Sequence, residues 1–220
     1  MLYNGVMTKT IIGLIGFIGA GKGTVADILR EHHGFHTDSF AATLKDAVAP
    51  VFGWPRDMLE GDTPESREFR EKPDDFWCEK LCRDDFTPRL ALQLVGTDVF
   101  RNNFHRDTWI YSMERRLLET HSNVVISDVR FQNEISLIHD LGGAIIRVRR
   151  GPEPEWFAHA VKANAGNTRS RTIMQNDYSH VHASEWGWAG ADPDYIIDND
   201  SDLDSLNIKV EEILTQIAHS

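Results

Sequence analysis

The stretch GLIGFIGAGKGTVADIL, residues 13–29, constrains the fold of this chain more than any other segment. It begins as an apolar run, passes through closely spaced glycines and a lysine, and continues with the periodicity of an amphipathic helix. Gly16, Gly21 and Lys22 fit the pattern G-x-x-x-x-G-K, whose glycines let successive backbone N–H groups curl around a phosphate. The stretch therefore predicts a strand, a phosphate-binding loop and a helix in direct succession.

The lysine and the start of the helix supply the positive charge that such a loop needs. The helix contributes its positive N-terminal end, and Lys22 can reach the β- and γ-phosphates of a nucleotide. The Ser or Thr that usually follows the lysine is replaced by Gly23, and Thr24 comes one position later. A flexible glycine turn without a ligand is the alternative, but it leaves the lysine and both flanking elements as coincidences.

Strand-like and helical segments alternate along the rest of the chain. The apolar runs NVVISD, AIIRVRR and DYIIDN are typical of buried strands, and amphipathic runs lie between them. This alternation predicts an α/β fold, a parallel sheet flanked by helices with right-handed crossovers. Residues 54–87 and 151–191 lack apolar periodicity and are predicted to be insertions above the sheet, and residues 1–9 are interpreted as a frayed leader.

The charge balance limits the classes of partner. A formal net charge of −11 disfavours a general binder of nucleic acid or anionic membrane, because neutralising a phosphate backbone needs a basic surface. The apolar stretch Ile11 to Ile18 is much shorter than the about 20 residues of a membrane helix, and it is too rich in glycine for a secretory leader. We expect a cytoplasmic protein that binds small phosphorylated molecules, with no membrane and no nucleic acid as partner; a homodimer is left open.

An acidic residue and an arginine follow one of the predicted buried strands. Asp128 ends the VVIS run, and an acid at the C-terminal edge of a parallel strand can hold Mg²⁺ or its waters beside phosphates. By itself Asp128 would be a helix cap, but the phosphate loop favours the metal. Arg130 lies two residues further on, where its guanidinium group could bind a phosphate in a bidentate manner. A surface salt bridge explains an arginine at this position equally well.

Two longer blocks carry a resemblance to a known family. TPRLALQLVGTDVFRNNFHRDTW and VVISDVRFQNEISLIHDLGGAIIRVRR, with HASE and a terminal YIIDND, resemble the deoxynucleoside monophosphate kinases of tailed bacteriophages. GAGKGT is similar to the loop of nucleoside monophosphate kinases such as adenylate kinase. The resemblance implies a P-loop kinase fold that transfers the γ-phosphoryl group of ATP to a 2′-deoxynucleoside 5′-monophosphate (dNMP). It implies one domain, with a core at about 10–53, 122–150 and 192–220, a helical monophosphate-binding arm at about 54–121 and a lid at about 151–191.

The resemblance, together with the positions of Lys45 and Asn199 in the predicted elements, indicates which residues act. The candidates for ATP binding are Ile18, Gly19, Ala20, Gly21, Lys22, Gly23, Thr24 and, at the end of the last strand, Asn199. The candidates for dNMP binding are Lys45, Arg89, Gly96, Thr97, Asp98, Trp109, Asp128, Arg130 and Glu185. The expected catalytic residues are Lys22, Arg89, Asp128 and Arg130, and the expected ligands of Mg²⁺ are Thr24 and Asp128.

Several of these residues have plainer explanations. Trp109 could stack on a base, although an aromatic in an amphipathic helix is more often part of the core, and a surface lysine such as Lys45 usually has no specific role. His180 and His182 in HVHASE suggest a metal, but two histidines at this spacing lie on opposite sides of a helix, so zinc is not expected. Phosphoryl transfer needs converging arginines, and the candidates in the lid are Arg169 and Arg171.

Two other functions fit a phosphate loop. A P-loop kinase of dephospho-coenzyme A, gluconate or a mevalonate derivative would keep the fold and change the acceptor, and the LVGTDVFRNN block argues against it because it resembles the nucleotide family. A non-catalytic nucleotide-binding regulator would have no reason to cluster arginines in two insertions. We therefore predict an Mg²⁺-dependent dNMP kinase that uses ATP.

Overall fold

The computed structural model describes residues 9–219; residues 1–8, most of the predicted leader, and Ser220 lie outside the described part. The chain divides into two compact units, Met1–Ser39 with Leu117–Ser220, and Phe40–Arg116. The second unit thus begins fourteen residues before the predicted arm, so that it includes the first helix after the second strand. We refer to the two as the sheet unit and the helical unit.

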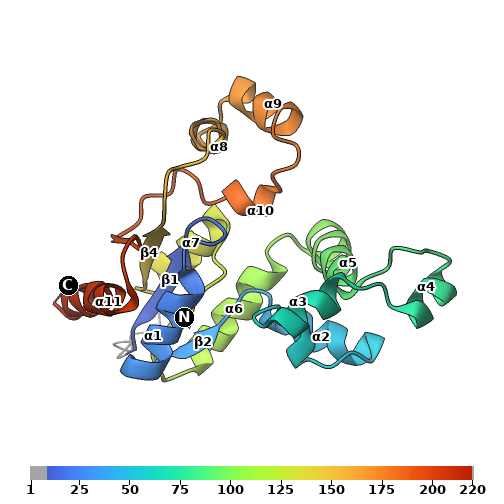
Figure 1. Cartoon of the computed structure of the whole chain (residues 1–220), viewed down its shortest axis with the longest axis horizontal. Coiled ribbons are helices and arrows are strands. Elements are labelled where there is room, and N and C mark those ends of the chain that lie inside the picture. Colours follow the sequence, from blue (N-terminus) through green and yellow to red (C-terminus); the bar gives the residue numbers. More distant parts are fainter. Residues whose placement is uncertain (1–8, 220) are drawn as a thin grey trace. The chain divides into compact units, whose positions relative to one another are not determined.

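The sheet unit contains a single five-stranded parallel sheet (Figure 1). Its order is β2-β3-β1-β4-β5, with β1, which is buried at every residue, in the centre. The strands are β1 (Ile11–Ile15), β2 (His36–Asp38), β3 (Val124–Ile126), β4 (Ala144–Arg149) and β5 (Tyr195–Asp198). The predicted α/β class and parallel sheet are confirmed, and the apolar runs form the strands as expected.

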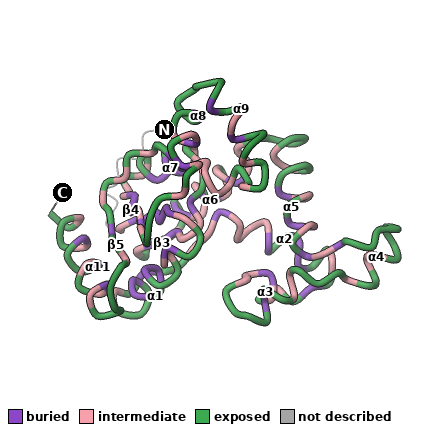
Figure 2. Tube along the Cα trace, turned by 45° about the horizontal axis from the view of Figure 1, so that its top comes forward, coloured by how far each residue is buried: buried purple, intermediate pink, exposed green. Residues whose placement is uncertain are grey.

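Three long helices cover the sheet. On one face, α1 (Lys22–His33) and α11 (Leu203–Ala218) pack against alternate residues of the strands, and this core includes Ile12, Leu14, Val25, Leu29, Val125, Ile146, Val148, Ile197, Leu206 and Val210. On the other, α7 (Gln132–Asp140) brings Ile138 over Gly13, where an added Cβ would lie 2.6 Å from Ile138 Cδ1. Every residue of β1 and β3 is buried, whereas Figure 2 shows long exposed stretches along α1 and α11.

The segment predicted as the lid, residues 151–191, belongs to the sheet unit and forms three helices. These are α8 (Phe157–Asn164), α9 (Thr168–Asn176), whose N-cap is Asn167, and the single turn α10 (Ala183–Trp186). Asn164 at the end of α8 donates from its amide to the carbonyl oxygens of Trp186 (3.0 Å) and Ala189 (2.8 Å). The C-terminal end of α8 is therefore tied to the C-terminal end of α10 and the residues that follow it.

The helical unit is built from short helices with polar caps. They are α2 (Ala42–Phe52), η1 (Asp57–Leu59), α3 (Pro64–Glu71), α4 (Asp75–Leu81), α5 (Pro88–Gln93) and η2 (Leu94–Phe104), and α6 (Thr108–Glu119) runs on into the sheet unit. Thr63, Asp74 and Thr87 cap α3, α4 and α5. A core centred on Val48, Trp54, Leu59, Phe86 and Leu92 joins them, with the rings of Phe52 and Trp54 stacked 4.7 Å apart.

The run RLALQLVGTDVFRNNF, residues 89–104, has the amphipathic pattern of one helix, and the structure divides this segment in two. The first part is the α-helix α5, and the second, η2, is a π-helix. π-Helical turns are rare and occur frequently at functional sites, which makes η2 notable because it carries Gly96, Thr97 and Asp98. Among residues 9–219, no helix is both long and apolar enough to span a membrane.

Candidate active site

The loop between β1 and α1 requires glycine at its entry. Gly16 has a φ of +143°, and a Cβ at this position would lie 2.3 Å from the carbonyl oxygen of Val148 on β4. A side chain would therefore collide with the backbone of the adjacent strand. The chain can leave β1 beside β4 and turn into the loop only because this residue is glycine.

The other end of the loop is the N-terminus of α1. Its N-cap, Gly21, has a φ of +98° and no side chain with which to bond the first amides of the helix, which leaves them to an anion. Asn199, directly after β5, donates from Nδ2 to the carbonyl oxygen of Ala20 (2.9 Å). A Cβ at Gly21 would lie 2.2 Å from the same Nδ2. Asn199 thus stabilises the loop through its backbone. The predicted contact of Asn199 with ATP stays a prediction.

Lys22 is held against the loop that precedes it. Its Nζ donates to the carbonyl oxygens of Gly16 (2.8 Å) and Phe17 (2.9 Å), which uses two of the three protons of the ammonium group. Burial, and after it the charge of Arg130, lower the pKa of Lys22 to about 8, although the carboxylate of Asp128 opposes both effects. These charges act on one another only because β1 and β3 end at the same edge of the sheet.

The segment after β3 is fixed by a buried carboxylate. Glu134, 2% exposed, accepts hydrogen bonds on Oε2 from the backbone N–H groups of Arg130 (2.7 Å) and Phe131 (3.2 Å). The backbone of Arg130 is thereby locked where the strand passes into α7. The structure thus brings together Lys22, Asp128 and Arg130, three of the four predicted catalytic residues.

The HASE motif contacts Arg130 through Ser184, a residue that the sequence prediction missed. Arg130 Nη1 donates to Ser184 Oγ (3.2 Å), and this oxygen lies 2.8 Å from Nδ1 of His182. Gly187 lies so close to Arg130 that a Cβ would be 2.7 Å from its carbonyl oxygen. The predicted Glu185 lies in the same turn, half-buried, with its N–H bonded to the carbonyl of His182 (2.9 Å). The signal available in the sequence was the position of Ser184 within the motif.

The lid arginines lie on α9. Arg169 and Arg171 are both exposed, and Arg171 Nη2 reaches the carbonyl oxygen of Ala163 (3.4 Å). Their predicted role as phosphate clamps stays a prediction.

In the helical unit, the candidates on η2 are accessible. Thr97 and Asp98 are exposed, and Asn103 donates from Nδ2 to the carbonyl oxygen of Asp98 (2.6 Å). Arg89, in the first turn of α5, forms an exposed ion pair between Nη1 and Oε1 of Glu71 (2.5 Å). A surface pair of this kind is weak, so Arg89 can exchange Glu71 for a phosphate at little cost.

Trp109 and Gly96 belong to the interior of the helical unit. Trp109 is 6% exposed, its indole N–H donates to the carbonyl oxygen of Gly96 (3.0 Å), and its ring lies 4.9 Å from that of Phe100. The indole thus anchors η2 from within. Its hydrogen bond to Gly96 is observed, whereas stacking on a base stays a prediction.

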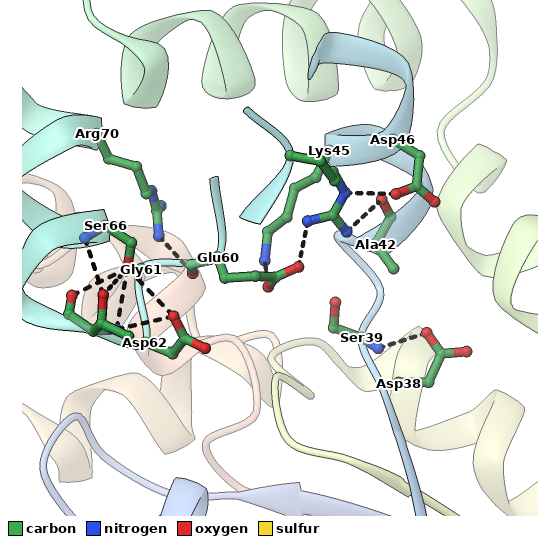
Figure 3. Close-up of polar contacts among 12 residues, drawn as sticks. Asp38, Ser39, Ala42, Lys45, Asp46, Glu60, Gly61, Asp62, Ser66 and Arg70 are labelled. Carbon is green, nitrogen blue, oxygen red and sulfur yellow. Dashed lines mark hydrogen bonds and ion pairs between the residues drawn. The ribbon is translucent and has the colours of Figure 1, made fainter. Parts of the chain in front are cut away.

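Lys45 contacts a carboxylate in this structure. It is 8% exposed, and its Nζ lies 2.5 Å from Oε2 of Glu60, which also pairs with Arg56 (Figure 3). Arg56 in turn bonds through Nε to Asp46 (2.5 Å). Burial alone would raise the pKa of Glu60, but hydrogen bonds from Lys45 and Arg56 lower it overall. The charge of Lys45 is thus balanced within the unit, and binding of a substrate phosphate by Lys45 stays a prediction.

The donor groups at the sheet edge suit magnesium. Within residues 9–219, no cluster of three or more His, Cys, Asp or Glu side chains could hold a metal by itself. Mg²⁺ with a nucleotide needs no such cluster, because it keeps several waters and takes one or two carboxylates together with phosphate oxygens. Asp128 and the exposed hydroxyl of Thr24 are oxygen donors of this kind.

A parallel sheet with this strand order, a glycine loop leading into a helix, and a lysine, an acid and an arginine at the strand ends define a P-loop kinase. Comparison with known proteins identifies a family within this class of kinases. The family model described as deoxynucleotide monophosphate kinase matches residues 75–180, a range that includes η2, Asp128 and Arg130.

The curated relatives agree with the family model. A protein of Acanthamoeba polyphaga mimivirus, provisionally named a deoxynucleotide monophosphate kinase, is 36% identical over 152 residues, covering 64% of this chain and 74% of the relative. The deoxynucleoside-5′-monophosphate kinase of Escherichia phage T5 is 40% identical over 55 residues, 24% of this chain and 22% of that protein. The chain belongs to the deoxynucleotide monophosphate kinase family, and it is an ATP-dependent phosphotransferase.

Solved structures resemble the chain more distantly. TT1252 from Thermus thermophilus has a TM-score of 0.45 at 18% identity, with 94% of this chain and 97% of that chain covered. Dephospho-CoA kinase from Campylobacter jejuni has a TM-score of 0.44 at 12% identity, covering 95% of this chain and 97% of that chain. Likenesses of this degree assign no acceptor.

Proposed function

We propose that the sheet unit holds ATP and Mg²⁺, that the helical unit binds a dNMP, and that the γ-phosphoryl group passes to the 5′-phosphate to give dNDP and ADP. The observation that carries this proposal is the meeting of Lys22, Asp128 and Arg130 at one edge of the sheet, beside a loop whose amides suit phosphates. Phosphoryl transfer is mainly a matter of positioning and of neutralising charge on oxygens, and these residues supply both.

The donor phosphates are bound by the loop from Ile18 to Thr24. Backbone N–H groups of the loop and of the first turn of α1 surround the β-phosphate, and Lys22 directs its third proton to the β- and γ-phosphates. Arg130, locked by Glu134 and Ser184, screens the charge of the transferring group. A dNMP phosphate is already a nucleophile when ionised, so no general base is needed.

Asp128 and Thr24 are the residues proposed to hold Mg²⁺. When bound, the metal neutralises charge on the β- and γ-phosphate oxygens. Asp128 contributes a second effect of its own, since its carboxylate favours the protonated form of Lys22. The residue is therefore proposed both to bind the metal and to keep the lysine charged.

The acceptor is proposed to bind through Arg89, Gly96, Thr97 and Asp98. Arg89 is an exposed guanidinium held only by a surface ion pair, and Thr97 and Asp98 present a hydroxyl and a carboxylate from η2. These groups suit the phosphate and the sugar of a nucleotide respectively. In a cell, we expect the reaction in the cytoplasm, in the host's case where the chain is viral.

Replacement of Lys22 tests the proposal. Lys22→Met keeps the aliphatic stem and should reduce dNDP formation from ATP by about a hundredfold or more while the fold is retained. Lys80→Met, at an exposed lysine of α4 that pairs with its neighbour Glu79 and lies over the ring of Phe76, is the matched control and should leave the rate unchanged. Near-normal turnover of folded Lys22→Met would refute the assignment of the loop.

A further inference from the structure

An aromatic side chain connects the phosphate loop to the lid segment. Phe17 follows Gly16 in the loop, and its ring lies 5.5 Å from that of Trp156, 5.2 Å from that of Phe157 and 5.1 Å from that of Trp188. Trp156 and Phe157 open α8, whereas Trp188 follows α10. Residues from both ends of the lid segment therefore surround one residue of the loop.

A guanidinium lies within these rings. The central carbon of the Arg147 guanidinium is 4.9 Å from the centroid of Phe157, 5.1 Å from that of Trp188 and 5.9 Å from that of Phe17. Cations attract ring faces at such distances, more strongly when water is excluded. We call Arg147 and these four aromatic residues the Arg147 cluster.

The position of Arg147 is unusual for a charged side chain. It lies on β4 and is only 14% exposed, its Nη2 is 2.5 Å from Oε1 of Glu153, and its buried Nε has no hydrogen-bond partner among the described residues. A buried donor without a partner is costly, and an apolar residue would fill this space without that cost. The guanidinium group at this position therefore calls for an explanation other than a contribution to the stability of the fold.

The backbone of Phe17 supplies that reason. Its carbonyl oxygen accepts one of the two hydrogen bonds that hold Lys22 Nζ (2.9 Å). The ring of Phe17 is thus packed against the lid segment, while its carbonyl oxygen helps to orient Lys22. A shift of the lid ends would move the rings, then Phe17, and then the ammonium that binds the donor phosphates.

We propose that Arg147 and Phe17 are positioning residues, which transmit the placement of the two ends of the lid segment to Lys22. The proposal rests on the proposed role of Lys22 in binding ATP and does not depend on which acceptor is used. Neither side chain touches the reacting atoms in this account. Loss of either leaves the loop in place but frees the Phe17 carbonyl, so that Lys22 is less well held.

ATP binding without an acceptor is the primary measurement. Titration calorimetry on the full chain should show ATP affinity about tenfold or more weaker for Phe17→Leu and Arg147→Met, because small misplacements in such sites cost one to two orders of magnitude. Arg147→Lys keeps the charge and the stem but not the planar fork, and should lose affinity to a smaller degree. Since no dNMP is present, failure of this proposal is distinguishable from failure of the acceptor assignment.

A neighbouring arginine provides the control. Arg149, also on β4, pairs through Nε and Nη2 with both carboxylate oxygens of Asp198 (2.7 and 2.8 Å) and does not belong to the cluster. Arg149→Met should bind ATP as the unaltered protein does. This variant removes a guanidinium and an ion pair from the same strand, so it accounts for any general effect of such a loss.

A second readout separates positioning from mere packing. In a double-mutant cycle, Phe17→Leu and Arg147→Met should weaken ATP binding little further when Lys22 is already replaced by Met, because both act through the ammonium group of Lys22. ATP affinity equal to that of the unaltered protein in folded Phe17→Leu and Arg147→Met, or an equal further loss in the Lys22→Met background, would overturn the proposal. Weaker binding that is absent in the Lys22→Met background, with a normal Arg149→Met, would establish it.

Discussion

The pKa of Lys22 leads to a quantitative prediction about pH. Burial and the charge of Arg130 lower it from 10.5 to about 8 in the ATP-free protein. At about 1.4 kcal/mol for each pH unit, the site disfavours the ammonium form by about 3 kcal/mol. Above about pH 9 the protonated fraction of the free enzyme falls about tenfold for each unit, so the proton must be recovered before Lys22 can bind phosphate.

The kinetic consequence differs between two rate constants. We expect kcat/KM for ATP, which reports the free enzyme, to fall above about pH 8, by about fivefold between pH 8 and pH 9 and by about tenfold for each further unit. Bound phosphates raise the pKa of Lys22, so the decline of kcat, which reports the complex, should lie at higher pH. Arginine does not titrate in this range, so the smaller kcat/KM of Lys22→Arg should be flat.

The assay is the initial rate of dNDP formation at constant ionic strength from about pH 7 to about pH 9.5. Lys22→Arg is the matched variant, since it keeps the positive charge. The reasoning is refuted if kcat/KM of the unaltered protein stays level throughout. An equal decline in Lys22→Arg would also refute it, because the titrating group would then be another residue.

Three further predictions concern stability and the region around Arg130. The pKa of Lys22 in the folded protein lies below its value of 10.5 in the unfolded chain, so the unfolded chain binds more protons between about pH 8 and pH 10.5. The free energy of unfolding should therefore rise with pH over this range, relative to that of Lys22→Met, in urea titrations. Gly16→Ala, with its positive φ and contact with Val148, should lose about 2–5 kcal/mol in the same titrations; under 1 kcal/mol would contradict the loop geometry. Ser184→Ala should lower kcat about fivefold through Arg130 with little change in melting temperature, and an unchanged kcat would remove Ser184 from the site.

The features that the sequence predicts well are those encoded by neighbouring residues. The spacing of Gly16, Gly21 and Lys22 determines the loop because the glycines permit its backbone and the lysine directly follows. Apolar runs bounded by glycines and acids identify the strands, and the alternation of strands with helices implies a parallel sheet. Asp128 and Arg130 could be placed at the sheet edge because they follow a strand that is buried along its whole length.

The features that sequence reasoning missed depend on distant partners. Asn199 donates a hydrogen bond to Ala20, which lies 179 residues earlier in the chain, and nothing in the local sequence around either residue predicts that bond. Lys45 has a helical position like that of many surface lysines, and only the fold brings Glu60 to it. Similarly, amphipathic periodicity does not distinguish the π-helix η2 from an α-helix, since that depends on contacts such as the hydrogen bond from Trp109.

The direct test of the central claim is a panel of acceptors with ATP and Mg²⁺. All four dNMPs, their ribose counterparts, dephospho-coenzyme A, shikimate and gluconate would be compared at equal concentration, with products separated by ion-exchange chromatography. We expect at least one dNMP to be converted to its diphosphate with the highest kcat/KM of the panel, and we expect Lys22→Met to abolish this conversion. Preferential phosphorylation of an acceptor that is not a nucleotide, or ATP binding without transfer to any acceptor, would contradict this claim.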